Sequence, residues 1–163
     1  MTQLLTIGAA AVLVAAGTAN PCAAQDASSL PAAVKQAIHA NKPGADIDKL
    51  EIEKENGITL YDIEFKAGQG EIEVAEDGTV MDVTTIVQAK DVPEAASAAI
   101  RTAANGRAIK QLERSEVRAE IVKEGSAGRI SKLAAPKYVY EAELSTGEVE
   151  VTSDGKVIKA GKQ

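Results

Sequence analysis

Acidic side chains form the most regular chemical pattern of this sequence, because in the first half they alternate with apolar residues. The stretches LEIE, YDIEF and EIEV place six acids at every second position: Glu51, Glu53, Asp62, Glu64, Glu71 and Glu73. Two carboxyl groups that converge in a cleft can act as general acid and general base. Alternation with period two instead places such acids on the solvent-facing side of β-strands. We therefore expect an acidic surface that speeds the capture of a basic partner.

Nucleophilic catalysis finds no support in the remaining residues. A Ser, Cys or Thr nucleophile needs a neighbouring base, and the one histidine, His39, falls near the end of a predicted short helix. The one cysteine, Cys22, lies in an apolar N-terminal stretch. We predict a non-enzymatic protein with no catalytic residues and no cofactor.

Oxygen ligands for a cation are the next possibility. Acids that could offer them gather in two places: Asp46, Asp48 and Glu51, and then Glu76, Asp77 and Asp82. Neither group has the loop spacing of a dedicated calcium site, and no Cys or His cluster supports a structural metal. A metal site is not predicted, although a weakly bound surface cation stays open.

The first 24 residues predict a secretory signal peptide. They contain no charged side chain, and residues 4–16 are almost wholly apolar but shorter than the about 20 residues that span a membrane. Small residues follow and end in Cys22-Ala23-Ala24, which suits cleavage near Gln25. We expect a mature chain of residues 25–163 in the periplasm or outside the cell, with no transmembrane segment.

Charge is divided unevenly along the mature chain. Residues 25–90 contain six lysines and thirteen acids, for a net charge of −7, while residues 91–163 contain twelve basic and eleven acidic side chains. The first half would repel nucleic acid, and the second has no basic stripe that could bind it. Nucleic acid is therefore excluded as a partner.

The mature chain contains an internal repeat. Leu30-Pro31 aligns with Val92-Pro93 at an offset of 62 residues, and the match resumes after a longer insertion in the second copy. Further aligned positions are Val34 with Ala96, Ile38 with Ile100, Leu50 with Leu112, residues 61–65 with 140–144, and residues 71–74 with 148–151. Self-similarity of this kind indicates two copies of one structural unit.

Each copy predicts one helix followed by strands. Apolar residues recur at helical spacing after Leu30 and Val92, and they alternate with polar residues from Leu50 onward. The predicted fold class is α+β, with two tandem copies of a helix packed on a three- to four-stranded antiparallel meander. The modules are expected at residues 25–90 and 91–163. Whether their sheets join is left open.

The insertion in the second copy lies between Leu112 and Tyr140. Residues 123–137 predict a longer hairpin or a projecting loop, with a tolerated surface insertion as the alternative. Its candidate partner-binding residues are Lys123, Glu124, Arg129, Lys132 and Tyr138. Shortening residues 125–128 is expected to weaken partner binding and leave folding intact.

The tyrosines divide into two groups. Tyr61 and Tyr140 occupy equivalent positions on apolar strand faces, so we predict that both lie in the core. Tyr138 lies beside the insertion, and we predict that it is exposed.

The repeated features resemble the PepSY domain family. They are the leading Leu-Pro or Val-Pro helix, the Tyr-acid-x-Glu strands at Tyr61 and Tyr140, the Glu-x-Glu-Val strands and the Asp-Gly turns. The resemblance implies a helix-on-sheet module of secreted and envelope proteins, with a peptidase-inhibiting or protein-regulating role and no catalytic residues. The tandem arrangement is similar to the β-lactamase inhibitor protein.

These observations predict an exported, non-catalytic PepSY-like protein that binds a protein partner such as an envelope or secreted peptidase. Whether binding inhibits or regulates that partner is left open. The insertion is the favoured specific contact, and the acidic residues of the first module provide general steering. The alternative is an envelope sensor that binds a small ligand or a cation through the acidic first module.

Overall fold

The computed structural model describes residues 29–125 and 127–161, and the predicted signal peptide lies outside these ranges. The first half contains α1 (Ala32–Asn41), β1 (Ile47–Glu55), β2 (Ile58–Phe65), β3 (Glu71–Ala75) and β4 (Val80–Ile86). The second half contains α2 (Glu94–Ala104), β5 (Ile109–Glu124), β6 (Ala127–Leu144), β7 (Glu148–Thr152) and β8 (Val157–Ala160). Short 3₁₀ turns lie at Lys66–Gly68 and Ala89–Asp91. None of the helices described is long and apolar enough to cross a membrane.

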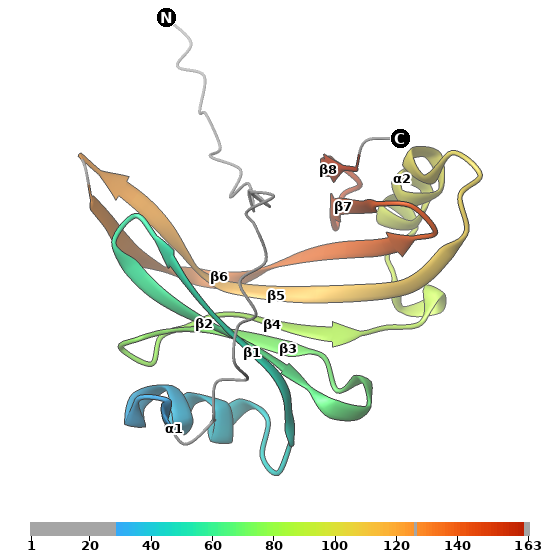
Figure 1. Ribbon diagram of the computed structural model, residues 1–163. Coiled ribbons are helices and arrows are strands. Elements are labelled where there is room, and N and C mark those ends of the chain that lie inside the picture. The colour runs from blue at the N-terminus through green and yellow to red at the C-terminus, as the bar shows by residue number, and fades with distance from the viewer. Residues whose placement is uncertain (1–28, 126, 162–163) are drawn as a thin grey trace, which may run out of the picture.

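The eight strands of the described residues form one antiparallel sheet in the order of the sequence, from β1 to β8. The predicted fold class of two tandem helix-on-meander copies is therefore wrong, because β4 pairs with β5 through residues 82–86 and 113–117. Two separate meanders would expose the unpaired N–H and C=O groups of β4 and β5 at open edges. Pairing satisfies those groups, and Figure 1 shows β4 and β5 adjacent in the middle of the molecule.

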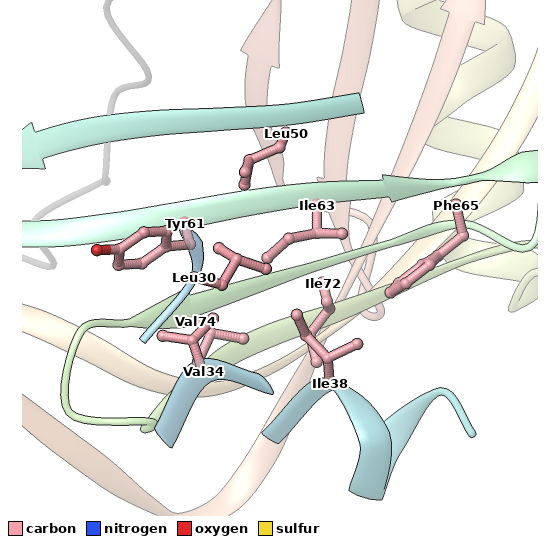
Figure 2. Packing of buried hydrophobic residues seen from close by; sticks show 9 residues of the cluster. All are labelled: Leu30, Val34, Ile38, Leu50, Tyr61, Ile63, Phe65, Ile72 and Val74. Atoms are coloured by element: carbon pink, nitrogen blue, oxygen red, sulfur yellow. The ribbon is translucent and has the colours of Figure 1, made fainter. Parts of the chain in front are cut away.

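The sequence repeat is visible in two hydrophobic cores on the helix-bearing face of this sheet. The first core contains Leu30, Val34, Ile38, Leu50, Tyr61, Ile63, Phe65, Ile72 and Val74, and Figure 2 shows these side chains between α1 and the strands. The second contains Val92, Ala96, Ile100, Ala104, Tyr140, Ala142, Leu144, Val149 and Val151. Most members of the two sets are aligned repeat positions. The prediction that Tyr61 and Tyr140 lie in the core is confirmed.

Local sequence explains where the two helices begin and which side they bury. Pro31 and Pro93 immediately precede them with φ of −54° and −53°, values that the proline ring favours before a first helical turn. Val34 and Ile38 of α1, like Ala96 and Ile100 of α2, recur one helical turn apart and face the sheet.

A third apolar cluster lies on the opposite face of the sheet and joins the two halves. It contains Leu60, Ala75, Met81 and Ala119, with Ile58, Ile121 and Ile130 packed against it. Ala119, Ile121 and Ile130 belong to the distal part of the long β5–β6 hairpin, which is the insertion that distinguishes the second copy. The insertion is therefore a hairpin that packs back over the first half.

Candidate functional site

The structure brings the six predicted acids of the first half onto one face of the sheet, opposite α1. Residues directly across an antiparallel pair share a face. Glu51 lies across from Asp62, Asp62 from Glu73, and Glu64 from Glu71. Glu53 lies across from Leu60, which faces away from α1 into the third apolar cluster.

The same face continues through the second half because the two halves share one sheet. Glu73 lies across from Asp82, and on the far side Glu113 lies across from Glu141 and Glu141 from Glu150. We call this surface the acidic face and define it by Glu51, Glu53, Asp62, Glu64, Glu71, Glu73, Asp82, Glu113, Glu141, Glu143, Glu148 and Glu150. Sequence reasoning missed the members beyond Glu73 as part of this site. The repeated Glu-x-Glu pattern at residues 141–143 and 148–150 was a signal for them.

Burial and mutual repulsion change the ionisation of the acids in the first half. Burial, followed by the nearby charge of Asp62, raises the pKa of Glu71 to about 8. Burial and then Asp82 raise the pKa of Glu73 to about 8. The pKa values of Asp82 and Asp62 rise to about 7 and about 6, again chiefly through burial. These carboxyl groups retain protons at pH values where an exposed acid has lost its own.

Carboxyl groups of the second half also have shifted pKa values. Burial raises the pKa of Glu141 to about 7, and neighbouring Glu148 adds to the effect. Burial also raises the pKa of Glu150. Glu148 itself has a lowered pKa because it accepts a hydrogen bond from Lys159.

Basic side chains pair with several acids of this face, and one of them, Lys110 Nζ on β5, lies 3.1 Å from Glu143 Oε1. Lys49 Nζ lies 2.9 Å from Glu51 Oε1 on β1, and Lys159 pairs with Glu148 near the other edge. A hollow of about 40 Å³ near the first edge is lined by Lys49, Glu51, Asp62, Glu64 and Glu71. Within residues 29–125 and 127–161, no group of three or more His, Cys, Asp or Glu side chains is arranged to hold a metal ion. The exposed His39 lies near the end of α1 and does not belong to the acidic face.

The hairpin candidates lie at the far end of β5 and β6. Arg129 Nε donates to Glu124 Oε1 at 2.6 Å, across the tip from β6 to β5. Lys123 lies across from Gly128 in the same hairpin and is exposed. The Gly128 amide bonds to the Asn56 carbonyl oxygen in the β1–β2 turn, so the tip is attached to the first half.

Tyr138 lies apart from the acids, on the helix-bearing face. Its side chain is 41% exposed, which confirms the prediction of exposure. The Arg114 guanidinium lies 5.6 Å from the centre of the Tyr138 ring, a cation–π contact. Arg114 Nε is buried without a hydrogen-bond partner in the described part of the chain. Sequence reasoning missed Arg114, whose position across from Tyr140 becomes clear only from the pairing of β5 with β6.

Lys132 lines an open groove between the hairpin and the β3–β4 turn. The groove has a volume of about 440 Å³ and is lined by Gly78, Thr79, Val80, Arg118, Lys132, Leu133 and Pro136. Arg118 is fixed there by bonds to Asn41 Oδ1 at 2.6 Å and Glu116 Oε1 at 2.9 Å. The predicted contacts thus fall into an acidic face, a hairpin end and a helix-side surface around Tyr138, rather than one patch.

Comparison with solved structures gives relatives of low sequence identity. A DUF2874 family protein from Bacteroides uniformis is 12% identical with a TM-score of 0.48, and the match covers 79% of this chain and 86% of that protein. A BLIP-like protein from Bacteroides fragilis is 11% identical with a TM-score of 0.44, over 82% and 89% of the two chains. A search of curated proteins gives no match.

A third solved relative also has low sequence identity. It is a Bacteroides vulgatus protein described as a "putative periplasmic protein of unknown function", 22% identical with a TM-score of 0.38 over 85% of this chain and 96% of its own.

A family model identifies the chain more directly. The model described as "Putative beta-lactamase-inhibitor-like, PepSY-like" matches twice, over residues 22–82 and 59–124. The resemblance to PepSY domains is thereby confirmed. Since the two matches together cover more than half of the sequence, the chain belongs to this PepSY-like, beta-lactamase-inhibitor-like family.

Proposed function

We propose that this chain is a non-catalytic protein of the bacterial envelope that binds a protein partner through its acidic face. The partner would present a basic patch. We propose an envelope or secreted enzyme such as a peptidase as this partner, which binding would inhibit or regulate. The family description, beta-lactamase-inhibitor-like, supports an enzyme as the kind of partner.

The observation that carries this proposal is the row of carboxyl groups lying directly across from one another. Asp62 is flanked by Glu51 and Glu73, and Glu73 is flanked by Asp62 and Asp82. Like charges directly across a strand pair destabilise a sheet. Several of these groups therefore keep protons near neutral pH. A Lys or Arg side chain from a partner would stabilise their charged form.

Release of protons on binding would distinguish this binding mode. A basic group placed beside Glu71 or Glu73 favours the charged carboxylate and lowers its raised pKa. Binding near pH 7 should therefore release protons. The heat of binding should then depend on the ionisation enthalpy of the buffer.

The hairpin and the helix-side surface around Tyr138 are the proposed sources of specificity. Loops and hairpin ends held on a rigid sheet commonly carry recognition. Arg and Tyr are enriched among residues that dominate binding energy, and Arg114 with Tyr138 forms such a pair. The exposed Lys123 and the Glu124–Arg129 pair provide further contacts at the tip.

The first experiment is affinity capture from envelope extract with the immobilised mature chain, residues 25–163. The test variant is Glu71→Gln/Glu73→Gln, and the matched control, Glu76→Gln/Glu94→Gln, removes two exposed acids outside the acidic face. A protein retained by the wild type and the control but lost from the test variant would support the proposal. Equal retention by all three would contradict it.

Calorimetry with the purified partner, in two buffers of different ionisation enthalpy, then checks for proton release. Titration of the mature chain alone with calcium and magnesium covers the alternative of a cation sensor. A shift in melting temperature with either ion, together with no captured protein, would favour that alternative over the proposal.

A further inference from the structure

Strand β1 is an open edge of the sheet. In the described part of the chain, β2 is the only strand that pairs with it. Its outer backbone N–H and C=O groups therefore have no strand partner there, and such an edge is a template for another strand. Ile52 on this strand is 42% exposed, although it lies across from the buried Tyr61.

The sequence of β1 is complementary to itself when it is read antiparallel about Glu51. In that register Lys49 of one copy lies across from Glu53 of the other. Leu50 lies across from Ile52, so the exposed Ile52 would cover the edge of the other copy's first core. Opposite charges and apolar residues that meet across strands each stabilise a pair.

Neighbouring registers fit less well. A register centred on Ile52 sets Glu51 across from Glu53 twice. A register centred on Leu50 sets Ile52 across from Asp48 and pairs only residues 47–53 of the strand. The register about Glu51 extends over the whole of β1 and keeps the irregularity between Ile47 and Lys49 outside its central pairs, at the cost of one contact between the two copies of Glu51.

We propose that two copies of this chain associate through β1, antiparallel and centred on Glu51, so that their sheets continue into one another. The two-fold axis is perpendicular to the sheet and places both acidic faces on the same side. The pair would thereby present a doubled acidic surface. A single added strand buries less than a standard interface, so the association is weak and depends on concentration.

Sedimentation velocity of the mature chain over a concentration series measures this association. Lys49→Glu and Glu53→Lys each turn two attractive contacts into repulsive ones and should raise the dissociation constant by about tenfold or more. An equimolar mixture of the two variants restores both contacts and should associate as the wild type does. Circular dichroism of each variant checks that it folds.

Cross-linking tests the register independently. The mature chain contains no cysteine, so Glu51→Cys introduces one thiol directly across from its own copy, within disulfide reach. Glu55→Cys is the matched control, since the register places its two copies about 26 Å apart. Rapid disulfide formation by the first variant alone supports the proposal. Equal rates for both, or a wild-type chain that stays monomeric at every concentration, would overturn it.

Discussion

The amide N–H of Gly128 donates a hydrogen bond of 2.7 Å to the carbonyl oxygen of Asn56. Gly128 lies near the tip of the β5–β6 hairpin and Asn56 in the turn between β1 and β2, so one bond joins hairpins from the two halves. A Cβ atom at position 128 would lie 2.8 Å from Asn56 Cβ and 2.9 Å from Ile121 Cγ2. The close approach therefore requires glycine.

Substitution of this glycine should loosen the hairpin. Gly128→Ala forces Asn56 or Ile121 to move and is expected to lower the free energy of unfolding by about 1–3 kcal/mol. Urea unfolding measures the loss, and amide hydrogen exchange should show faster exchange around Asn56. The neighbouring exposed Ala127, replaced by Ser, is the control. Equal stability of the two variants would mean that the tip contact contributes nothing.

Shortening of the hairpin should also lower the stability of the fold. Removal of residues 125–128 deletes the Gly128 contact and disturbs Ile121 and Ile130, which pack on the third apolar cluster. We therefore expect a loss of stability as well as any loss of binding. The substitution Glu124→Ala, which removes an exposed ion pair with Arg129, is better suited to a test of binding alone.

Stability should fall as pH rises from about 5 to about 8.5. Glu71 and Glu73 have folded-state pKa values of about 8, whereas unfolded glutamates titrate near pH 4. Between these values the folded state binds more protons than the unfolded state, so the free energy of unfolding decreases with pH. Thermal melts across this range should show a falling melting temperature at constant ionic strength.

The substitution Glu73→Gln should flatten that dependence. It removes one raised pKa and the repulsion with Asp82, so the melting temperature should rise at pH 8 more than at pH 5. Glu64→Gln, at an exposed position of the same face, is the matched control and should change the slope less. A wild-type melting temperature that stays constant or rises with pH would contradict the assigned shifts.

The junction between the halves offers another test. Thr84 is buried on β4, and its Oγ1 lies 2.7 Å from Ser115 Oγ on β5. Thr84→Val removes this hydrogen bond and should cost about 1–2 kcal/mol. Thr85→Val, one residue away on the other face, is the control and should change stability by less than about 0.5 kcal/mol. Similar losses for both variants in urea unfolding would argue against a role for the bond.

Much of the local structure could be predicted from sequence, because it depends on neighbours along the chain. Pro31 and Pro93 marked the helix starts, and the alternation around Tyr61 and Tyr140 marked strands with one buried side. The joining of the two halves could not be predicted. It depends on pairing between residues 82–86 and 113–117, which are separated by α2, and alternation within a strand does not specify its neighbour.

The candidate site could likewise be predicted only in part. Alternation correctly grouped Glu51, Asp62 and Glu71 on one face. The alternation predicted that these acids face solvent. In the structure, the sheet partly buries Asp62, Glu71 and Glu73, and this burial raises their pKa values. These three acids lie on strands that have a paired strand on each side. A single strand carries no sign of this burial.

Amide NMR of the isotopically labelled mature chain, titrated with the captured partner, would locate the contact directly. We expect chemical-shift changes concentrated on the acidic face, around Asp62, Glu73 and Glu141, with weaker binding as salt concentration increases. The Glu71→Gln/Glu73→Gln variant should bind less tightly. Changes confined to α1 and α2, with affinity unaffected by salt or by this variant, would contradict binding through the acidic face.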